Sequence, residues 1–173
     1  VINHINDPSL NITTIEDPVE STIAGVNHVP IKEKTGFGFA EALRSILRQD
    51  PDVVFVGEMR DREVSAIALK AALTGHLVLS TLHTNGIVET FVRLIDMGLD
   101  TYLLASSIEL VLAQRLLRRV CPGCAKPAAL PPEALAAGLF TAEQAAASAY
   151  REGAGCDQCL GTGYKGRVAV YES

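Results

Sequence analysis

Short apolar runs recur along the first half of the chain, and turn-forming residues separate them. Val53–Val56 is an uninterrupted apolar run, as expected of a strand that is buried on both faces. His76–Leu82 is a second run of this kind, and Asn11–Ile15 alternates polar and β-branched residues in a pattern typical of strands. Ser21–Ile31 also alternates, which predicts an edge hairpin or short strands.

Helical spacing of apolar residues separates these runs. We expect one helix to end at Asp50-Pro51, because the residue before a proline disfavours the helical conformation. A second helix should begin at Asp61, a good N-cap residue, and a third should end near Gly98. We also predict a fourth helix from Thr101 to Arg119. The inward face of the third helix is predicted to consist of Val88, Phe91, Val92 and Ile95. Alternating strands and helices indicate an α/β fold.

Polar side chains follow three of the predicted strands. Glu16 and Asp17 come after the first strand, Glu58 follows the run ending at Val56, and His83 follows the next strand. Open α/β sheets bind ligands at the carboxyl ends of their strands. An apolar strand ending in a carboxylate is also typical of a Walker B segment, which presents the acid to Mg²⁺ and water beside a γ-phosphate. A solvated turn is the alternative interpretation of Glu16 and Asp17.

The chain has further histidines for which we predict structural roles. His76 lies at the start of a predicted strand, where a histidine is usually a hydrogen-bonding partner of nearby groups. His28 is predicted to be a surface or interstrand residue. Only His83, beside a hydroxyl and an amide and placed like Glu58 at a strand end, is predicted to sense phosphate.

The cysteines form two C-x-x-C units, with the pattern C-x2-C-x31-C-x2-C. Two such units supply the tetrahedral set of thiolates that binds structural zinc. The predicted zinc ligands are Cys121, Cys124, Cys156 and Cys159. Four cysteine ligands leave zinc no open position for chemistry, so a structural role is expected; free or redox-active thiols are the alternative. The insert between the units should hold two short helices, the second starting with the capping box Thr141-x-x-Gln144.

Composition narrows the classes of protein that remain. The 173 residues are enough for one domain and a small second module. A net charge of -5 argues against nucleic-acid binding, which usually needs a basic face. We expect neither a transmembrane helix nor a signal peptide, because the apolar stretches are interrupted and the first residues lack a basic region. The missing initiator Met suggests a fragment of a longer protein.

Four sequence motifs together resemble one family. The motifs are TIEDPVE (Thr14–Glu20), DPDVVFVGEMRD (Asp50–Asp61), TGHLVLSTLHTN (Thr74–Asn85) and the paired C-x-x-C units. In this order they are similar to the aspartate box, Walker B segment, histidine box and zinc element of the secretion ATPases of type II secretion and type IV pilus assembly. The chain resembles the second half of such an ATPase over nearly all of its length.

The resemblance implies a RecA-like ATPase core that uses ATP and Mg²⁺. It implies that Glu58 activates or orients the attacking water, with Glu16 as the second candidate. Asp17 and Glu20 would complete an acidic, nucleotide-binding edge, and His83 would contact the γ-phosphate region. It further implies a hexameric ring, a cytoplasmic location at the inner membrane and a platform protein in that membrane as partner.

The resemblance also sets expectations for the limits of the chain. The family's phosphate-binding Walker A loop is not among these residues, so we expect the chain alone to bind ATP weakly or not at all and to be inactive. The expected parts are a partial RecA-like domain at 1–119, a zinc-binding element at 120–165, and at 166–173 the start of a segment that continues the motor domain.

Two other functions remain open at this stage. A RecA-type motor that moves nucleic acid would share the core, although the acidic composition gives it no basic groove. A non-enzymatic, zinc-stabilised interaction module for a membrane partner would share the cysteines.

Overall fold

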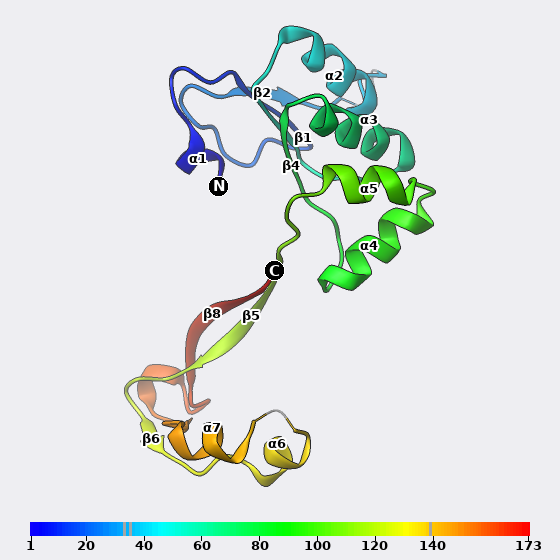
Figure 1. Cartoon of the computed structure of the whole chain (residues 1–173). Helices are drawn as coiled ribbons and strands as arrows, with labels where there is room; N and C mark the ends of the chain where they lie inside the picture. Colours follow the sequence, from blue (N-terminus) through cyan, green and yellow to red (C-terminus); the bar gives the residue numbers. More distant parts are fainter. Residues whose placement is uncertain (33, 35, 139) are drawn as a thin grey trace. The chain divides into compact units, whose positions relative to one another are not determined.

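The computed structural model describes residues 1–32, 34, 36–138 and 140–173 (Figure 1). The chain divides into two compact units. The first consists of Val1–Ala113 with Glu172–Ser173, and the second of Gln114–Tyr171. The second unit therefore holds, besides the cysteine element expected at 120–165, most of the two strands that precede and follow that element.

A parallel sheet of four strands forms the centre of the first unit. Its strands are β1 (Ile12–Glu16), β2 (Asn27–Pro30), β3 (Val53–Val56) and β4 (Leu77–Ser80). They lie in the order β2-β1-β3-β4, and each neighbouring pair is parallel. The four carboxyl ends therefore share one edge. Of the two possibilities expected for Ser21–Ile31, this described segment shows a short strand and no hairpin: β2 lies at the edge of the sheet and pairs in parallel with β1.

Two helices cover one face of this sheet (Figure 1). They are α2 (Phe39–Ile46), which continues as the 3-10 turn η2 (Leu47–Gln49), and α3 (Arg62–Leu73). Their apolar sides pack on Ile15, Val54 and Val56, which are fully buried. The opposite face carries Ile12 and Val53, against which the short helix α1 (Ile2–Ile5) packs. Alternate residues of β1 and β3 thus serve two separate cores.

The predicted start of α3 is confirmed. Asp61 is the N-cap, and its carboxylate accepts a hydrogen bond of 2.9 Å from the backbone N–H of Val64. This bond satisfies one of the amide groups that a helix leaves unpaired at its first turn. Helix α3 therefore begins immediately after the loop that carries Glu58.

The prediction for the inward face of the third helix is wrong. In α4 (Ile87–Asp96), Val88, Val92 and Ile95 are exposed, and the buried residues are Thr90 and Leu94. Leu94 packs in a small cluster with Leu69, Leu99 and Leu104. The helix therefore contacts its neighbours along the edge marked by Leu94, and its broad apolar stripe faces outward.

The fourth helix begins at Thr101 as predicted, but its predicted end at Arg119 is wrong. Helix α5 spans only Thr101–Ser107, and strand β5 begins at Ala113 and continues to Val120. The hydroxyls of Ser106 and Ser107 donate to backbone carbonyls of the preceding turn, so they compete for the groups that maintain the helix. The arginines near Val120 lie on a strand and do not compensate a helix dipole.

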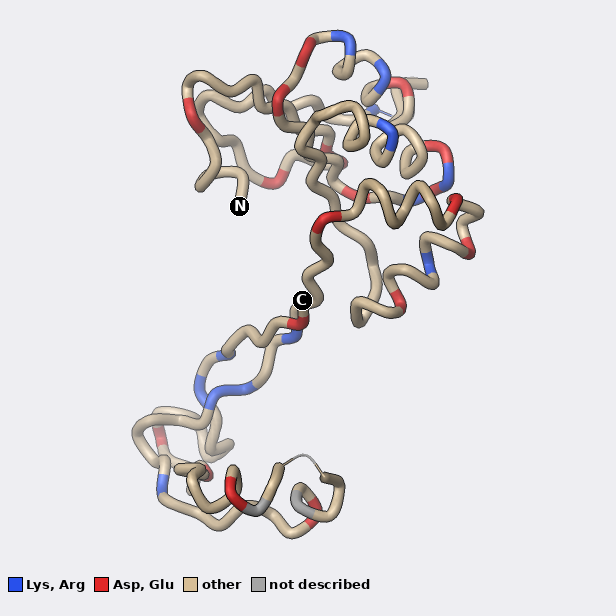
Figure 2. The backbone as a smooth tube through the Cα atoms, in the orientation of Figure 1, with Lys and Arg blue, Asp and Glu red and all other residues tan. Residues whose placement is uncertain are grey.

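The second unit is built on a ribbon of β5 and β8 (Tyr164–Glu172), which pair in a two-stranded sheet. Lys and Arg residues concentrate on this ribbon (Figure 2). Beyond it, β6 (Ala125–Pro127) and β7 (Arg151–Gly153) form an antiparallel pair.

The insert contains the two predicted helices, α6 (Pro132–Ala136) and α7 (Ala142–Ala147), and the capping box of Thr141 and Gln144 is present. The second C-x-x-C unit lies on the turn η3 (Asp157–Cys159). Across the described residues, none of the helices has the length and apolarity needed to cross a membrane.

Candidate functional site

A cleft of about 220 Å³ opens at the carboxyl edge of the parallel sheet. Its lining includes the acidic residues and the histidine that the sequence placed at strand ends: Glu16, Asp17, Glu20, Glu58 and His83. The structure therefore brings together the residues predicted to bind nucleotide and water. Phe39 and Phe55 provide apolar wall to the same cleft.

Each carboxylate oxygen of Glu58 has a basic side chain beside it. Arg60 Nη2 donates to Oε1 at 2.6 Å, and His83 Nε2 lies 3.2 Å from Oε2. The hydrogen bond from Arg60 lowers the pKa of Glu58, and the charges of Arg60 and His83 also favour the ionised form against partial burial. Glu58 is therefore a carboxylate at neutral pH, fit to attract a cation or to orient water.

Arg60 also links two of the acidic residues, and sequence reasoning missed it. Its Nη2 lies 3.5 Å from Asp17 Oδ2, and its guanidinium carbon lies 5.4 Å from the centre of the Phe39 ring. The guanidinium group thus joins the ends of β1 and β3 and the start of α2. Its position two residues after Glu58 is a signal that the sequence offered, since residues at this spacing on an extended segment share one side.

Gly57, directly before Glu58, allows the ends of β1 and β3 to lie close together. Its N–H donates to the Ile15 carbonyl at 2.8 Å, and a Cβ at this position would lie only 3.0 Å from the same oxygen. A side chain would press on the backbone atom that fixes the end of β3 to β1. Glycine therefore allows the close approach that brings Glu58 beside the end of β1.

The structural roles predicted for the other two histidines are confirmed. His76 Nδ1 lies 3.0 Å from the Ala71 carbonyl oxygen, at the junction of α3 and β4. His28 on β2 bonds across to β1, where Nδ1 lies 3.0 Å from Glu16 Oε1. The second contact makes His28 part of the surroundings of the cleft, a role that the sequence alone did not suggest.

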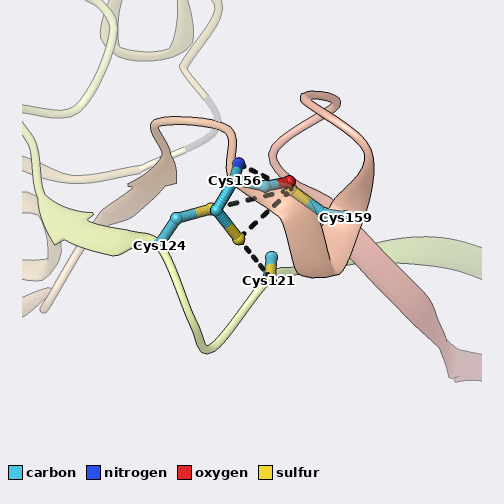
Figure 3. Close-up of side chains that lie close together, drawn as sticks. All are labelled: Cys121, Cys124, Cys156 and Cys159. Carbon is cyan, nitrogen blue, oxygen red and sulfur yellow. Dashed lines mark hydrogen bonds between the residues drawn. The ribbon is translucent and has the colours of Figure 1, made fainter.

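The four cysteines of the second unit converge on one point (Figure 3). All four sulfur atoms lie within 4.8 Å of one another, and the pairs 121–156, 124–159 and 156–159 are separated by 3.9, 3.8 and 3.7 Å. Four thiolates bound tetrahedrally to one zinc at about 2.3 Å have sulfur atoms about 3.8 Å apart. The cluster thus has the donor type, number and spacing that zinc requires.

The thiols of this cluster differ in acidity. Burial opposes ionisation of Cys159, but the backbone N–H groups of Cys156 and Gly163 donate to its sulfur and lower its pKa to about 6. Burial raises the pKa of Cys124 to about 12, and its thiol neighbours add to that shift. One sulfur is thus prepared as a thiolate by the turn that carries it, which suits the first ligand of a cation.

The fold and the cleft define the class of the first unit. It is an α/β domain with a parallel sheet, and acidic side chains and a histidine gather where such sheets bind ligands. The whole chain, residues 1–173, matches the model of the family described as Type II/IV secretion system protein. The chain belongs to this family, which confirms the resemblance drawn from the four sequence motifs.

Named relatives cover nearly all of the chain. It is 50% identical over 173 residues to the type IV pilus assembly ATPase PilB of Acinetobacter baylyi, which covers 99% of this chain and 30% of the relative. It is 48% identical over 168 residues to type II secretion system protein E of Pseudomonas aeruginosa, with 97% of this chain and 33% of the relative covered. The chain thus spans about a third of the length of these relatives.

Solved structures of a pilus retraction motor and of an ATPase share the fold. The pilus retraction motor PilT with bound ADP superposes with a TM-score of 0.63 at 42% identity, covering 70% of this chain and 38% of PilT. The ATPase DotB of Legionella pneumophila gives a TM-score of 0.56 at 32% identity, covering 68% of this chain and 36% of DotB.

Proposed function

We propose that this chain is part of a cytoplasmic ATPase that powers type IV pilus assembly or type II protein secretion by ATP hydrolysis. The observation that carries the proposal is the convergence of Glu16, Asp17, Glu20, Glu58 and His83 on one cleft at the carboxyl edge of the sheet. The names of the relatives as pilus assembly ATPases and a secretion protein support it. In this proposal the first unit is part of a RecA-like core.

The chemistry of the cleft suits a nucleotide bound with Mg²⁺. Carboxylate oxygens are the ligands that this cation prefers, and in such sites Mg²⁺ neutralises charge on the transferred phosphate. Glu58, ionised because of Arg60, would orient the attacking water, with Glu16 as the alternative for this role. Asp17 and Glu20 would contribute to the acidic, nucleotide-binding edge. His83, exposed at the mouth of the cleft, would contact the γ-phosphate region.

The second unit is proposed to bind one structural zinc ion through Cys121, Cys124, Cys156 and Cys159. The sulfur spacing supports this assignment. Zinc with four cysteine ligands has no open position, so its contribution would be to hold the two C-x-x-C turns together. This matters because the unit has few buried apolar residues of its own: its fully or nearly buried side chains include Cys121 and Cys159.

The assembly proposed for the full-length protein is a homohexamer at the inner membrane, bound to a platform protein of the pilus or secretion machine. We propose no nucleic-acid partner, in keeping with the acidic composition. The 173 residues contain no G-x-x-x-x-G-K-[ST] pattern. We therefore expect the chain by itself to bind ATP weakly or not at all. A micromolar dissociation constant for ATP, measured by isothermal titration calorimetry, would contradict this expectation.

The decisive experiment is Glu58→Gln in the full-length protein. It removes the charge and keeps the shape, so ATP turnover should fall by about 10²–10⁴-fold, the usual contribution of a group that acts on a proton. Glu63→Gln is the matched control, because Glu63 is an exposed residue of α3 that pairs with Arg44. Unchanged turnover in Glu58→Gln would contradict the role of Glu58 and leave Glu16 as the candidate, whereas a full-length wild type without ATP turnover would favour the interaction module.

A further inference from the structure

A buried hydrogen-bonded group lies beside the cleft on β1 and β2. Thr14 of β1 stands directly opposite His28 of β2 in the parallel register, and Glu16 is two residues further along β1. Side chains at alternate positions of a strand share a face. The three side chains therefore lie on the same face of the sheet, and Glu16 reaches the cleft at its edge.

The backbone around His28 determines which nitrogen of the ring carries a proton. The N–H of Ile23 points at His28 Nε2 with a nitrogen–nitrogen distance of 3.0 Å. A backbone N–H can only donate, so Nε2 must accept, and the proton of the neutral ring is on Nδ1. The Ile23–Asn27 segment thus prepares the imidazole as a donor toward β1.

That donor lies within hydrogen-bonding distance of two acceptors, the Thr14 hydroxyl and one oxygen of Glu16. His28 Nδ1 lies 3.0 Å from Glu16 Oε1 and 2.8 Å from Thr14 Oγ1, while the Thr14 hydroxyl donates to the same Oε1 at 2.6 Å. Thr14 is fully buried, and the side chains of His28 and Glu16 are 12% and 13% exposed. In these largely buried surroundings the Thr14 hydroxyl holds Glu16 Oε1 directly, and His28 holds it either directly or through Thr14.

Glu16 and Glu58 are consequently held in different ways. Both oxygens of Glu58 face a cation or a histidine. In the described part of the chain, the side-chain bonds of Glu16 all fall on Oε1 and come from Thr14 and His28. Oε2 of Glu16 is left for a ligand in the cleft that this residue lines.

We propose that His28 is a positioning residue for ATP hydrolysis: with Thr14 it locks Glu16 Oε1 so that Oε2 faces the bound nucleotide or its attacking water. This inference rests on the proposed function and adds a role for a residue outside the sequence motifs. It predicts that the hydrogen-bonding capacity of position 28, and not merely its volume, sets the turnover rate.

The test uses the full-length protein and two pairs of variants. His28→Ala removes the donor, whereas His28→Asn offers an amide N–H close to the place of Nδ1. Thr14→Val removes the hydroxyl with little change in shape, whereas Thr14→Ser retains it. We expect kcat to fall about 10-fold or more in His28→Ala and Thr14→Val with KM for ATP nearly unchanged, because small misplacements of a reacting group cost up to about 10²-fold. His28→Asn and Thr14→Ser should retain most of kcat.

Each outcome separates this inference from the proposed function. Wild-type protein that does not hydrolyse ATP overturns the proposed function and this role with it. Active wild type together with unchanged kcat in His28→Ala overturns the positioning role alone. Equal losses of kcat in His28→Asn and His28→Ala would show that residue 28 matters only for packing, and this result also overturns the positioning role. If His28→Ala fails to fold by circular dichroism, the Thr14→Val and Thr14→Ser pair decides.

Discussion

Glu58 Oε2 lies 3.2 Å from His83 Nε2, although the two residues follow different strands of the sheet. The contact exists because β3 and β4 are parallel neighbours and end at the same edge. The two side chains differ in freedom, since Glu58 is 22% exposed and His83 is 89% exposed. Neighbouring residues thus restrict the side chain of Glu58, whereas the side chain of His83 has room to adjust to a bound ligand.

We expect His83→Ala to impair turnover without weakening the fold. An exposed side chain contributes little to folding, so the free energy of unfolding should change by no more than about 0.5 kcal/mol. ATP turnover of the full-length protein should nevertheless fall, because the group that faces the cleft beside Glu58 is lost. Chemical denaturation and a phosphate-release assay measure the two effects. His4→Ala, at an exposed histidine of α1, should change neither.

Replacing Arg60 with Met should raise the pKa of Glu58 toward its ordinary value of 4.5, because the hydrogen bond from Arg60 is the main cause of its lowering. A lowered pKa in the folded state stabilises the fold above the pKa of the unfolded chain, and this stabilisation disappears as the pH falls through the folded pKa. Wild type should therefore be more stable than Arg60→Met near pH 7, and the difference should shrink below about pH 4.5.

Denaturant unfolding across this pH range measures the Arg60 effect. Arg93→Met, at an exposed position of α4, serves as the control with the same loss of charge. A difference between wild type and Arg60→Met that did not depend on pH would show that Arg60 acts through its contact with the Phe39 ring and not through Glu58.

Metal analysis of protein purified without added metal should give about one zinc per chain, as expected for a four-cysteine site. Cys121→Ser should lose the metal and destabilise the unit Gln114–Tyr171, because Cys121 is fully buried beside the other sulfurs. Asp157→Asn changes a neighbour of the ligands without touching a sulfur and should retain zinc. A zinc content near zero in wild-type protein would contradict the assignment.

Removing the N-cap of α3 should weaken the first unit measurably. Asp61→Ala deletes the acceptor of the Val64 N–H, which should cost about 1 kcal/mol of unfolding free energy. Asp61→Ser retains an oxygen that can accept this bond, so it should cost less. Thermal unfolding of the pair measures the effect, and equal stability of Asp61→Ala and wild type would rule out the capping contribution.

Several elements of the first unit could be predicted from the sequence because they have strong local signals. The run Val53–Val56 is too short and too apolar for anything but a buried strand, and Asp61 marks the next helix by its capping chemistry. Since parallel strands end at one edge, the residues after them had to meet. The position of Glu58, Glu16 and His83 around one cleft followed from that rule.

The errors occurred where tertiary pairing decided between two patterns. Leu116 and Leu117 sit among residues that suit a helix, and only pairing with β8, distant in sequence, makes Ala113–Val120 a strand. The stripe Val88, Val92 and Ile95 has helical spacing, yet spacing alone does not say which side of a helix meets a partner. His28 acquires its importance through contacts across strands, which no local pattern encodes.

The second unit is an insertion into the chain of the first unit, and the paired strands β5 and β8 lead into it and out of it. The chain leaves the first unit at Ala113 and returns to it at Glu172, and the two connecting strands run paired. Whatever lies beyond the ribbon can therefore vary in length and content without changing the order of strands in the parallel sheet. A change of length within the cysteine element would therefore leave the connections of the parallel sheet intact.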